Sequence, residues 1–224
     1  MTQATGVAAT VLSPFYYHSL AVPSGTATLP VFMPDRAMSF ALSAALGALR
    51  ASPALPLVPD YRGHLAALPW MTSVFETEDP ALLRPLAKRL NIDAEGGLQK
   101  KVMDATGTGN LKTYFFVQEV ALGVVYRGAV FGPDPFATVE RREGRRPREI
   151  VVRTGRHLAG LLRLERADVK AVRLNVHTAA LFEQESDLRV EIYALHDLQV
   201  TPRMPLDEAR DRVGRWRSFE GAAA

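Results

Sequence analysis

Residues 113–127 read TYFFVQEVALGVVYR, the most strand-like run in the chain. Aromatic and β-branched side chains dominate this stretch, and such residues favour extended structure. Near-continuous apolarity over this length is typical of a central strand that is covered on both faces. We therefore expect one central strand from Thr113 to Arg127, with a bulge at Gly123.

The segment before this strand has the composition of a loop that approaches a polyanion. It contains Lys100 and Lys101, the glycine-rich run ATGTGN at residues 105–110, and Lys112. Glycines allow close backbone approach, and lysines supply positive charge for phosphates. A flexible hairpin loop with solvated lysines would have the same composition, so this segment alone does not decide the function.

Length and composition indicate a single globular domain with elaborations. The chain has 224 residues, of which 47% are hydrophobic, enough for a sizeable core. The absence of cysteine excludes disulfides and thiolate zinc sites and favours a reducing compartment. No apolar run is long enough to cross a bilayer, and the first residues do not have the pattern of a signal peptide. We expect a cytoplasmic protein with no membrane contact.

Positive charge is concentrated in one part of the sequence. The net charge is only +3, but residues 136–173 contain eleven basic and five acidic side chains, whereas residues 174–202 contain one basic and five acidic. Such a basic segment beside an acidic one indicates a directed surface for a polyanion. The expected nucleic-acid contacts are Arg127, Arg141, Arg142, Arg145, Arg146, Arg148, Arg153, Arg156, His157 and Arg173, together with Lys100, Lys101 and Lys112.

The remaining periodicities predict an α+β domain. We expect further strands at residues 7–17, 149–153, 158–164, 169–178 and 188–194. We expect helices from Asp35, as N-cap, to Gly47 or Arg50, from Asp79-Pro80 to Leu90, and over residues 206–217. Residues 132–135 read as a turn and residues 140–148 as an exposed loop. This order predicts a mainly antiparallel sheet with helices packed on one face.

Two segments are candidates for a protruding thumb, residues 53–71 and residues 96–112. The first contains prolines at three-residue spacing and reads as an extended excursion from the core. Its aromatic and basic side chains could wedge between or stack on bases, or fix the loop to its own domain. These are Tyr61, Arg62, His64, Trp70 and Met71, of which we expect Trp70 and Met71 to be partly exposed in the isolated chain.

Catalytic and cofactor motifs are not apparent. The histidines, at positions 18, 64, 157, 177 and 196, have no spacing typical of a metal site. Gly107-Thr108-Gly109 lacks the Gly-Lys-Ser/Thr sequence of a P-loop, and there is no Gly-x-Ser-x-Gly nucleophile elbow. We therefore expect no metal and no cofactor. Arginine forks suit phosphates, and nearby aromatic rings suit unpaired bases, so a single-stranded nucleic acid fits best.

Four segments, taken in order, resemble a known family. They are Phe15-Tyr16-Tyr17 at the end of a strand, the alanine-rich helix from Asp35 to Gly47, the aromatic strand Tyr114–Val117, and Ile150–Arg156, which is similar to an Ile-Arg-x-Gly-Lys/Arg motif. Together they make residues 7–200 resemble the Cas-five family, the RAMP subunit that caps the 5′ handle of guide RNA in Class 1 CRISPR effector complexes, in its short type I-D or type IV variants.

This resemblance implies a ferredoxin-like (RRM-like) core with a thumb, and a subunit that binds crRNA without cutting it. The implied partners are crRNA, the backbone and large subunits of the complex, and target DNA near the handle. The chain lacks the glycine-rich C-terminal loop of the RNA-processing RAMP endonucleases. The Tyr/Lys/His set with which some type I-C members cut precursor RNA has no clear counterpart here.

Two other functions remain open from the sequence. A metal-independent endoribonuclease could use His18, His157 or His177 as general acid and base. A structural protein could use acidic residues 183–197 to dock a partner, with its arginines merely solvated.

Overall fold

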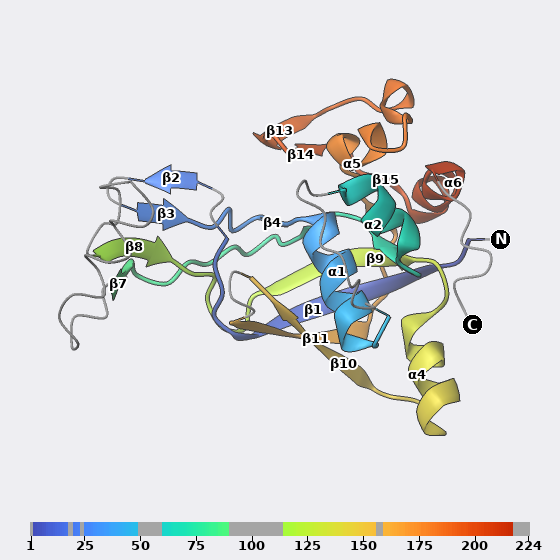
Figure 1. The fold of residues 1–224 in the computed structure, drawn as a ribbon, viewed down its shortest axis with the longest axis horizontal. Helices are drawn as coiled ribbons and strands as arrows, with labels where there is room; N and C mark the ends of the chain where they lie inside the picture. The colour runs from blue at the N-terminus through green and yellow to red at the C-terminus, as the bar shows by residue number, and fades with distance from the viewer. Residues whose placement is uncertain are drawn as a thin grey trace.

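Strand β1 (Ala4–Ser13) lies at the centre of the main sheet (Figure 1). The computed structural model describes residues 2–17, 20–22, 25–48, 60–89, 114–155 and 159–216. Buried and half-buried residues alternate along β1, because one face of the strand meets the core and the other does not. This confirms most of the strand predicted over residues 7–17. The observed strand begins three residues earlier than predicted and ends before Pro14.

The main sheet contains seven strands in the order β10-β11-β1-β9-β6-β4, and β5 also pairs with β9. Strand β1 pairs antiparallel with both of its neighbours, β11 and β9. The other members are β4 (Phe32–Met33), β5 (Met71–Thr72), β6 (Phe75–Glu76), β9 (Val125–Phe131), β10 (Glu149–Thr154) and β11 (Gly160–Arg166).

The chain connects these strands in a ferredoxin-like order. Strand β1 leads through helix α1 (Asp35–Ala45) to β5 and β6, and β9 then returns between them and β1. Helix α4 (Pro135–Glu143) follows, and the chain comes back along the other side of β1 as β11, with β10 added at the edge. The structure therefore confirms the predicted α+β class, with a mainly antiparallel sheet.

Helices α1 and α4 supply the core on one face of this sheet. Met38 and Leu42 from α1, and Phe136 from α4, join Val7 and Val11 of β1 in one buried cluster. The helical spacing of Met38 and Leu42 places both on the same side of α1. The predicted helix from Asp35 is thus confirmed, and its described end falls at Ala45.

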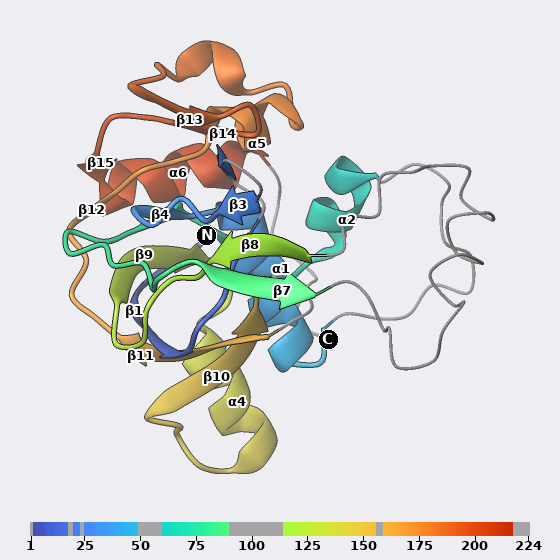
Figure 2. The ribbon, with the colours of Figure 1, turned by 90° about the vertical axis from the view of Figure 1, so that its left-hand side faces the viewer.

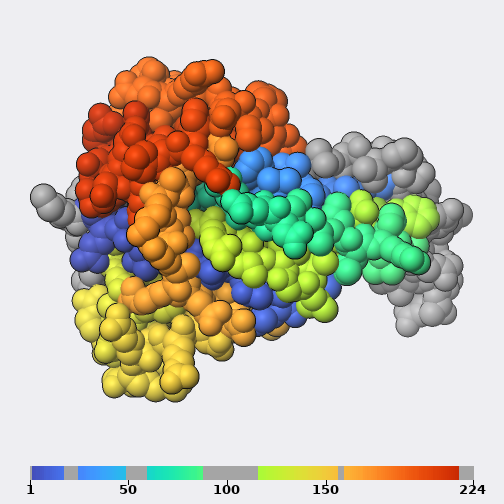
Figure 3. Space-filling view, turned by 180° about the vertical axis from the view of Figure 1, so that it is seen from behind, coloured from blue at the N-terminus to red at the C-terminus, as the bar shows by residue number. Residues whose placement is uncertain are grey.

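Residues 167–216 form a second layer against the opposite face. This layer contains β12 (Ala171–Val172), α5 (Val176–Ala180), the short 3-10 helix η3 (Glu185–Asp187), β13 (Ile192–Leu195), β14 (Leu198–Val200), β15 (Met204–Pro205) and α6 (Leu206–Trp216). Val213 and Trp216 of α6 join Ala129 and Phe131 of β9 in a second core. The chain crosses β1 closely at Gly6, where an added Cβ would meet the carbonyl oxygen of Ala167. Figure 3 shows the sheet from the side opposite α1, with this layer over part of it.

A small second sheet extends from the body as an arm (Figures 1 and 2). It contains β2 (Leu20–Val22), β3 (Gly25–Ala27), β7 (Leu86–Arg89) and β8 (Tyr114–Gln118), in the order β2-β3-β8-β7. Strands β7 and β8 flank the thumb candidate 96–112, which itself lies outside the described residues. Among the described residues, no helix is both long and apolar enough to cross a bilayer.

The prediction of one central strand over residues 113–127 is wrong. The stretch contains two strands in different sheets, β8 in the arm and β9 in the main sheet. Between them the chain turns at Leu122 and Gly123, and Gly123 has a φ of 80°. Glycine adopts this left-handed conformation without steric cost, so it marks a turn here where we expected a bulge.

The predicted helix over residues 79–90 is also wrong. Leu82 forms an isolated β-bridge with Val120, and residues 86–89 form strand β7. Pro85 explains the difference, because proline lacks the N–H that a helix interior requires and disfavours helical geometry at the residue before it.

Three further expectations need correction. Residues 140–143 belong to helix α4, so only the remainder of the predicted loop 140–148 is irregular. The predicted strand 169–178 is strand β12 followed by helix α5, and the strand predicted over residues 188–194 begins only at Ile192. The helix predicted over residues 206–217 is confirmed as α6.

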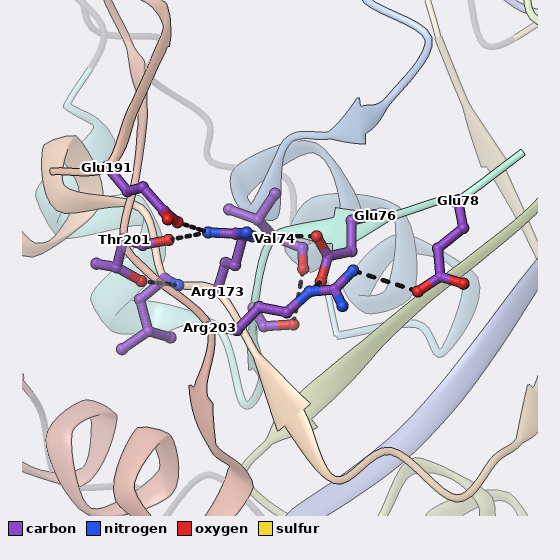
Figure 4. Close-up of polar contacts among 9 residues, drawn as sticks. Val74, Glu76, Glu78, Arg173, Glu191, Thr201 and Arg203 are labelled. Carbon is purple, nitrogen blue, oxygen red and sulfur yellow. Dashed lines mark hydrogen bonds and ion pairs between the residues drawn. The ribbon is translucent and has the colours of Figure 1, made fainter. Parts of the chain in front are cut away.

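Arg173 and Glu76 fasten the second layer to the sheet (Figure 4). The guanidinium of Arg173 donates to Glu76 over 3.1 Å and to the carbonyl oxygen of Thr201 over 2.7 Å, and it also pairs with Glu191. Glu76 accepts a second guanidinium, that of Arg203, at 2.8 Å. The Arg173 and Glu76 side chains are only 14% and 15% exposed, so the charge of each is compensated by the opposite charge of the other and not by water.

We predict that Glu76→Gln lowers the free energy of unfolding by about 2 kcal/mol, because it leaves a nearly buried arginine with one carboxylate fewer. Chemical denaturation measures this value. Glu78→Gln is the matched control, since Glu78 is 85% exposed and, of the two arginines that pair with Glu76, it pairs with Arg203 alone. Its effect is expected to stay within about 0.5 kcal/mol. Equal effects of the two substitutions would contradict the assigned role of Glu76.

Candidate nucleic-acid interface

Helix α4 presents the centre of the predicted basic segment. Asp134 is its N-cap and accepts hydrogen bonds from the backbone N–H groups of Phe136 at 3.0 Å and Ala137 at 3.4 Å. Pro135 occupies the first turn, where its missing N–H has no cost. Gly144 ends the helix with a φ of 72°. These signals could have been read in the sequence, and they place Arg141 and Arg142 in the last turn, where the helix dipole favours cations.

The five arginines from Arg141 to Arg148 are all exposed, but they have different partners. Arg142 donates to the carbonyl oxygen of Leu46, the C-cap of α1, at 3.0 Å. Arg146 lies 3.8 Å from Glu140, and Arg141 reaches only the hydroxyl of Thr138, at 3.4 Å. Within the described ranges, Arg145 and Arg148 form no ion pair. Arg142 therefore stabilises the fold by joining α4 to the end of α1, while Arg141, Arg145 and Arg148 are available to a ligand.

The sheet brings two more arginines onto its open face. Arg127 of β9 lies opposite Ala8, and Arg163 of β11 lies opposite Thr10. Ala8 and Thr10 are two residues apart on β1, so both arginines project from the face opposite α1. Arg163 is neutralised by Glu165 at 3.1 Å, whereas Arg127 is exposed and has no ion pair in the described part of the chain.

The remaining predicted RNA contacts differ in their exposure. Arg153 is exposed on β10, the edge strand of the sheet. Arg173 was predicted to contact RNA, but its side chain is 14% exposed and is held by Glu76 and Glu191, so that prediction is wrong. Lys100, Lys101, Lys112, Arg156 and His157 lie outside the described residues.

The predicted wedge residues divide into two groups. Trp70 is 3% exposed and donates its indole N–H to the carbonyl oxygen of Pro133 at 2.7 Å, and Met71 is 2% exposed within β5. Their predicted exposure is therefore wrong, because Trp70 packs into the cluster between the sheet and α1, and Met71 packs into the second core. Tyr61, Arg62 and His64 lie exposed on helix α2 (Tyr61–Ala67). Residues 53–59 of the excursion lie outside the described residues.

Asp35 is a buried residue whose partner the sequence did not indicate. Its carboxylate does not cap α1 and instead accepts a hydrogen bond from the Asn175 amide at 2.9 Å. Burial raises the pKa of Asp35, and the hydrogen bond from Asn175 opposes that shift. Asn175 also caps α5 and donates to the carbonyl oxygen of Asp197 at 2.9 Å. These bonds hold the start of α1, the start of α5 and the β13–β14 turn together.

Two histidines meet at this junction, although they are distant in sequence. The ring centroids of His177 and His196 are 5.6 Å apart. Burial lowers the pKa of His177, and the guanidinium of Arg36 lowers it further. His177 lies on helix α5 and not on the strand that was predicted over residues 169–178. Among the described residues, no group of three or more histidine or acidic side chains could hold a metal ion.

Comparisons with known proteins give a limited result. No protein-family model matches the chain. No curated protein matches it either. A solved structure of the type III-B Cmr-beta complex, bound to cognate target RNA and AMPPnP, contains a chain that is similar in fold with a TM-score of 0.41 and 13% sequence identity. The similarity covers 74% of this chain and 64% of that one, so this chain spans a little under two thirds of the matched chain.

We predict that Arg142→Ala lowers the free energy of unfolding by about 1 kcal/mol, because the carbonyl oxygen of Leu46 loses a charged donor. Arg145→Ala is the control and is expected to change that free energy by less than about 0.5 kcal/mol. Thermal or denaturant unfolding of the two variants provides the comparison. The division between structural and available arginines fails if Arg145→Ala is the more destabilising substitution.

Proposed function

We propose that this chain is a non-catalytic RNA-binding subunit of a CRISPR-Cas ribonucleoprotein complex. In this proposal it caps the 5′ handle of crRNA and contacts the adjacent backbone subunit, with the large subunit and target DNA near the handle as further partners. The observation that carries the proposal is the arginine end of the molecule, defined by Arg141, Arg145 and Arg148. Their guanidinium groups are exposed and have no carboxylate partner in the described ranges, as a phosphate contact requires.

The position of these arginines supports a strand of RNA that follows the sheet edge. Arg141 and Arg145 lie at the end of α4, Arg148 immediately precedes β10, and Arg153 lies farther along that strand. Strand β10 is the outermost strand of the main sheet, so its neighbouring space is not taken by another described strand. The basic side chains therefore lie along one edge, where a flexible single strand can reach them in succession.

The family resemblance adds the identity of the RNA. Three of its four segments form parts of the ferredoxin-like core: Phe15–Tyr17 follows β1, Asp35–Gly47 forms α1, and Ile150–Gly155 forms β10 and the turn after it. The fourth, Tyr114–Val117, lies in the arm as β8. Three segments of the resemblance thus lie around one core, and the fourth lies in the arm, directly after the thumb candidate 96–112 in sequence.

A structural protein with solvated arginines is the competing interpretation, and salt dependence separates the two. If Arg141, Arg145, Arg146 and Arg148 each neutralise one phosphate, log affinity for single-stranded RNA should fall against log salt with a slope of roughly −3. The triple variant Arg141→Gln/Arg145→Gln/Arg148→Gln should reduce the steepness by about 2. Fluorescence anisotropy at a series of salt concentrations measures both slopes.

The control for this titration is Arg215→Gln on α6. Arg215 is 58% exposed, close to the exposure of Arg146, but it lies on the second layer. We expect its slope to equal that of the wild type. A flat salt response of the wild type, or an unchanged slope in the triple variant, would remove the arginine end from the interface.

We further predict that the purified chain does not cut RNA. General acid–base cleavage requires titratable groups that a third group orients. Within the described part of the chain, the imidazole of His177 has no hydrogen-bond partner, and the imidazole of His196 hydrogen-bonds only with the hydroxyl of Tyr193, at 3.3 Å. The precursor repeat RNA, incubated without metal, should therefore remain intact while it stays bound. Specific cleavage that is lost in His177→Ala would establish the endoribonuclease alternative.

A further inference from the structure

The junction between α1, α2, α5 and the β13–β14 hairpin forms a surface of aromatic and imidazole rings. We call it the ring cluster and define it by Arg36, Tyr61, His177, Tyr193 and His196. The Arg36 guanidinium lies over the Tyr61 ring, 5.2 Å from its centroid. His196 bridges the hairpin, since its ring contacts His177 and its Nδ1 meets the Tyr193 hydroxyl at 3.3 Å. Figure 1 shows α2, α5 and the hairpin gathered around the start of α1.

The framework beneath these rings is rigid. Arg36 is 13% exposed and is held by the carboxylate of Asp197 at 2.9 Å and by its carbonyl oxygen at 3.1 Å. Asn175, which is 1% exposed, contacts Asp35, Asp197 and the backbone N–H of Gln199. The hydrogen bonds of this framework are thus made internally. A ligand would meet rings whose positions are already fixed.

Both tyrosine rings are exposed to solvent, although Arg36 lies over one face of Tyr61. Tyr61 is 48% exposed and Tyr193 is 64% exposed, and Tyr193 is the more exposed of the two tyrosines. Exposed tyrosines that share one surface with an arginine are typical of a binding surface, because tyrosine and arginine are enriched where interfaces form. His177 and His196 add ring nitrogens to the same surface. The cluster therefore offers stacking area together with hydrogen-bonding groups.

The charges of the cluster decide which part of a nucleotide would bind. Asp197 forms an ion pair with Arg36, and the neighbouring carboxylate of Asp35 accepts a hydrogen bond from Asn175. The lowered pKa of His177 keeps that imidazole neutral at pH 7, and a neutral imidazole can both donate and accept a hydrogen bond. Since the surface lacks an unpaired positive charge, it is suited to the face and edge of a base and not to a phosphate.

We propose that the ring cluster binds one unpaired nucleobase of the RNA, which stacks on Tyr193 or Tyr61 and hydrogen-bonds through its edge to His177 or His196. The inference rests on the proposed function, because the same RNA strand would be held by the arginine end. It adds a second contact on a different part of the molecule, formed by α1, α2, α5 and the hairpin. The two contacts differ in chemistry, since one depends on charge and the other on stacking.

Photo-crosslinking with single-stranded repeat RNA that contains photoreactive thiouridine tests the inference. We expect crosslinked peptides that contain Tyr193, His196 or Tyr61. Tyr193→Ala should weaken RNA affinity between about 5-fold and about 150-fold, the range for loss of one base–aromatic stack. Tyr193→Phe is the matched control and should keep the wild-type affinity within about twofold, because the ring remains. The salt slope of Tyr193→Ala should be unchanged, since no phosphate contact is removed.

The outcomes separate this inference from the proposed function. RNA that binds the wild type, yields no crosslink in the ring cluster and binds Tyr193→Ala equally well overturns the inference and leaves the proposed function standing. A crosslink at Tyr193 together with weakened binding of Tyr193→Ala supports the inference. If the wild type binds no RNA, both proposals are overturned. Loss of fold does not confuse the result, because the side chain of Tyr193 lies largely in solvent.

Discussion

The ion pair between Arg173 and Glu76 determines how the two layers of the molecule meet. A guanidinium that is 14% exposed requires a carboxylate, and Glu76 provides one from the sheet while Glu191 provides one from the second layer. Arg173 lies two residues before Asn175, the N-cap of α5, so this pair attaches the chain to the sheet just before that helix begins. Leu174 and Thr201 then continue the contact with backbone and hydroxyl hydrogen bonds. The Asn175 hydrogen bonds and the apolar contacts of Leu198 and Val200 with Phe32 and Val74 complete the attachment of α5 and the hairpin.

Both candidate contacts with RNA depend on that arrangement. The second layer covers the sheet near Gly6 and Ala129 and leaves the outer strands β10 and β11 open. The arginine end therefore lies beside an edge that remains accessible. The same attachment brings His177 to Arg36, so the ring cluster forms only where the second layer meets α1. The fold thus puts the positive charge at the arginine end and the rings for stacking at the ring cluster, in two different parts of the molecule.

The sequence indicated the elements whose signals are local. The periodicity of α1 and α6, and the short apolar run at residues 150–152 within β10, predicted those elements correctly. Pro85 and Gly123 also carried local signals, but the apolar pattern around each was given more weight than the backbone constraint. The Asp134-Pro135 pair was read as a turn, although the same residues begin α4. These errors could have been avoided from the sequence.

Other features could not have been predicted, because they depend on tertiary contacts. Arg142 and Arg145 are three residues apart with the same chemistry, and only the position of Leu46 distinguishes the structural residue from the available one. Trp70 packs into the apolar core, and its N–H is satisfied there by the carbonyl oxygen of Pro133, 63 residues away in sequence. His177 and His196 meet through the hairpin, whereas their spacing in sequence carries no motif. Which residue each of these side chains contacts is decided by the tertiary fold and not by the local sequence.

Sequencing of the nucleic acid that accompanies the protein tests the central proposal most directly. The chain would be purified with and without nuclease treatment from cells that express a matching CRISPR array, and its ultraviolet absorbance ratio would be compared. The account predicts bound RNA that is removed by nuclease and whose molecules share one 5′ end, with retention reduced in Arg141→Gln/Arg145→Gln/Arg148→Gln. Protein that carries no nucleic acid, or RNA with random 5′ ends, would contradict it.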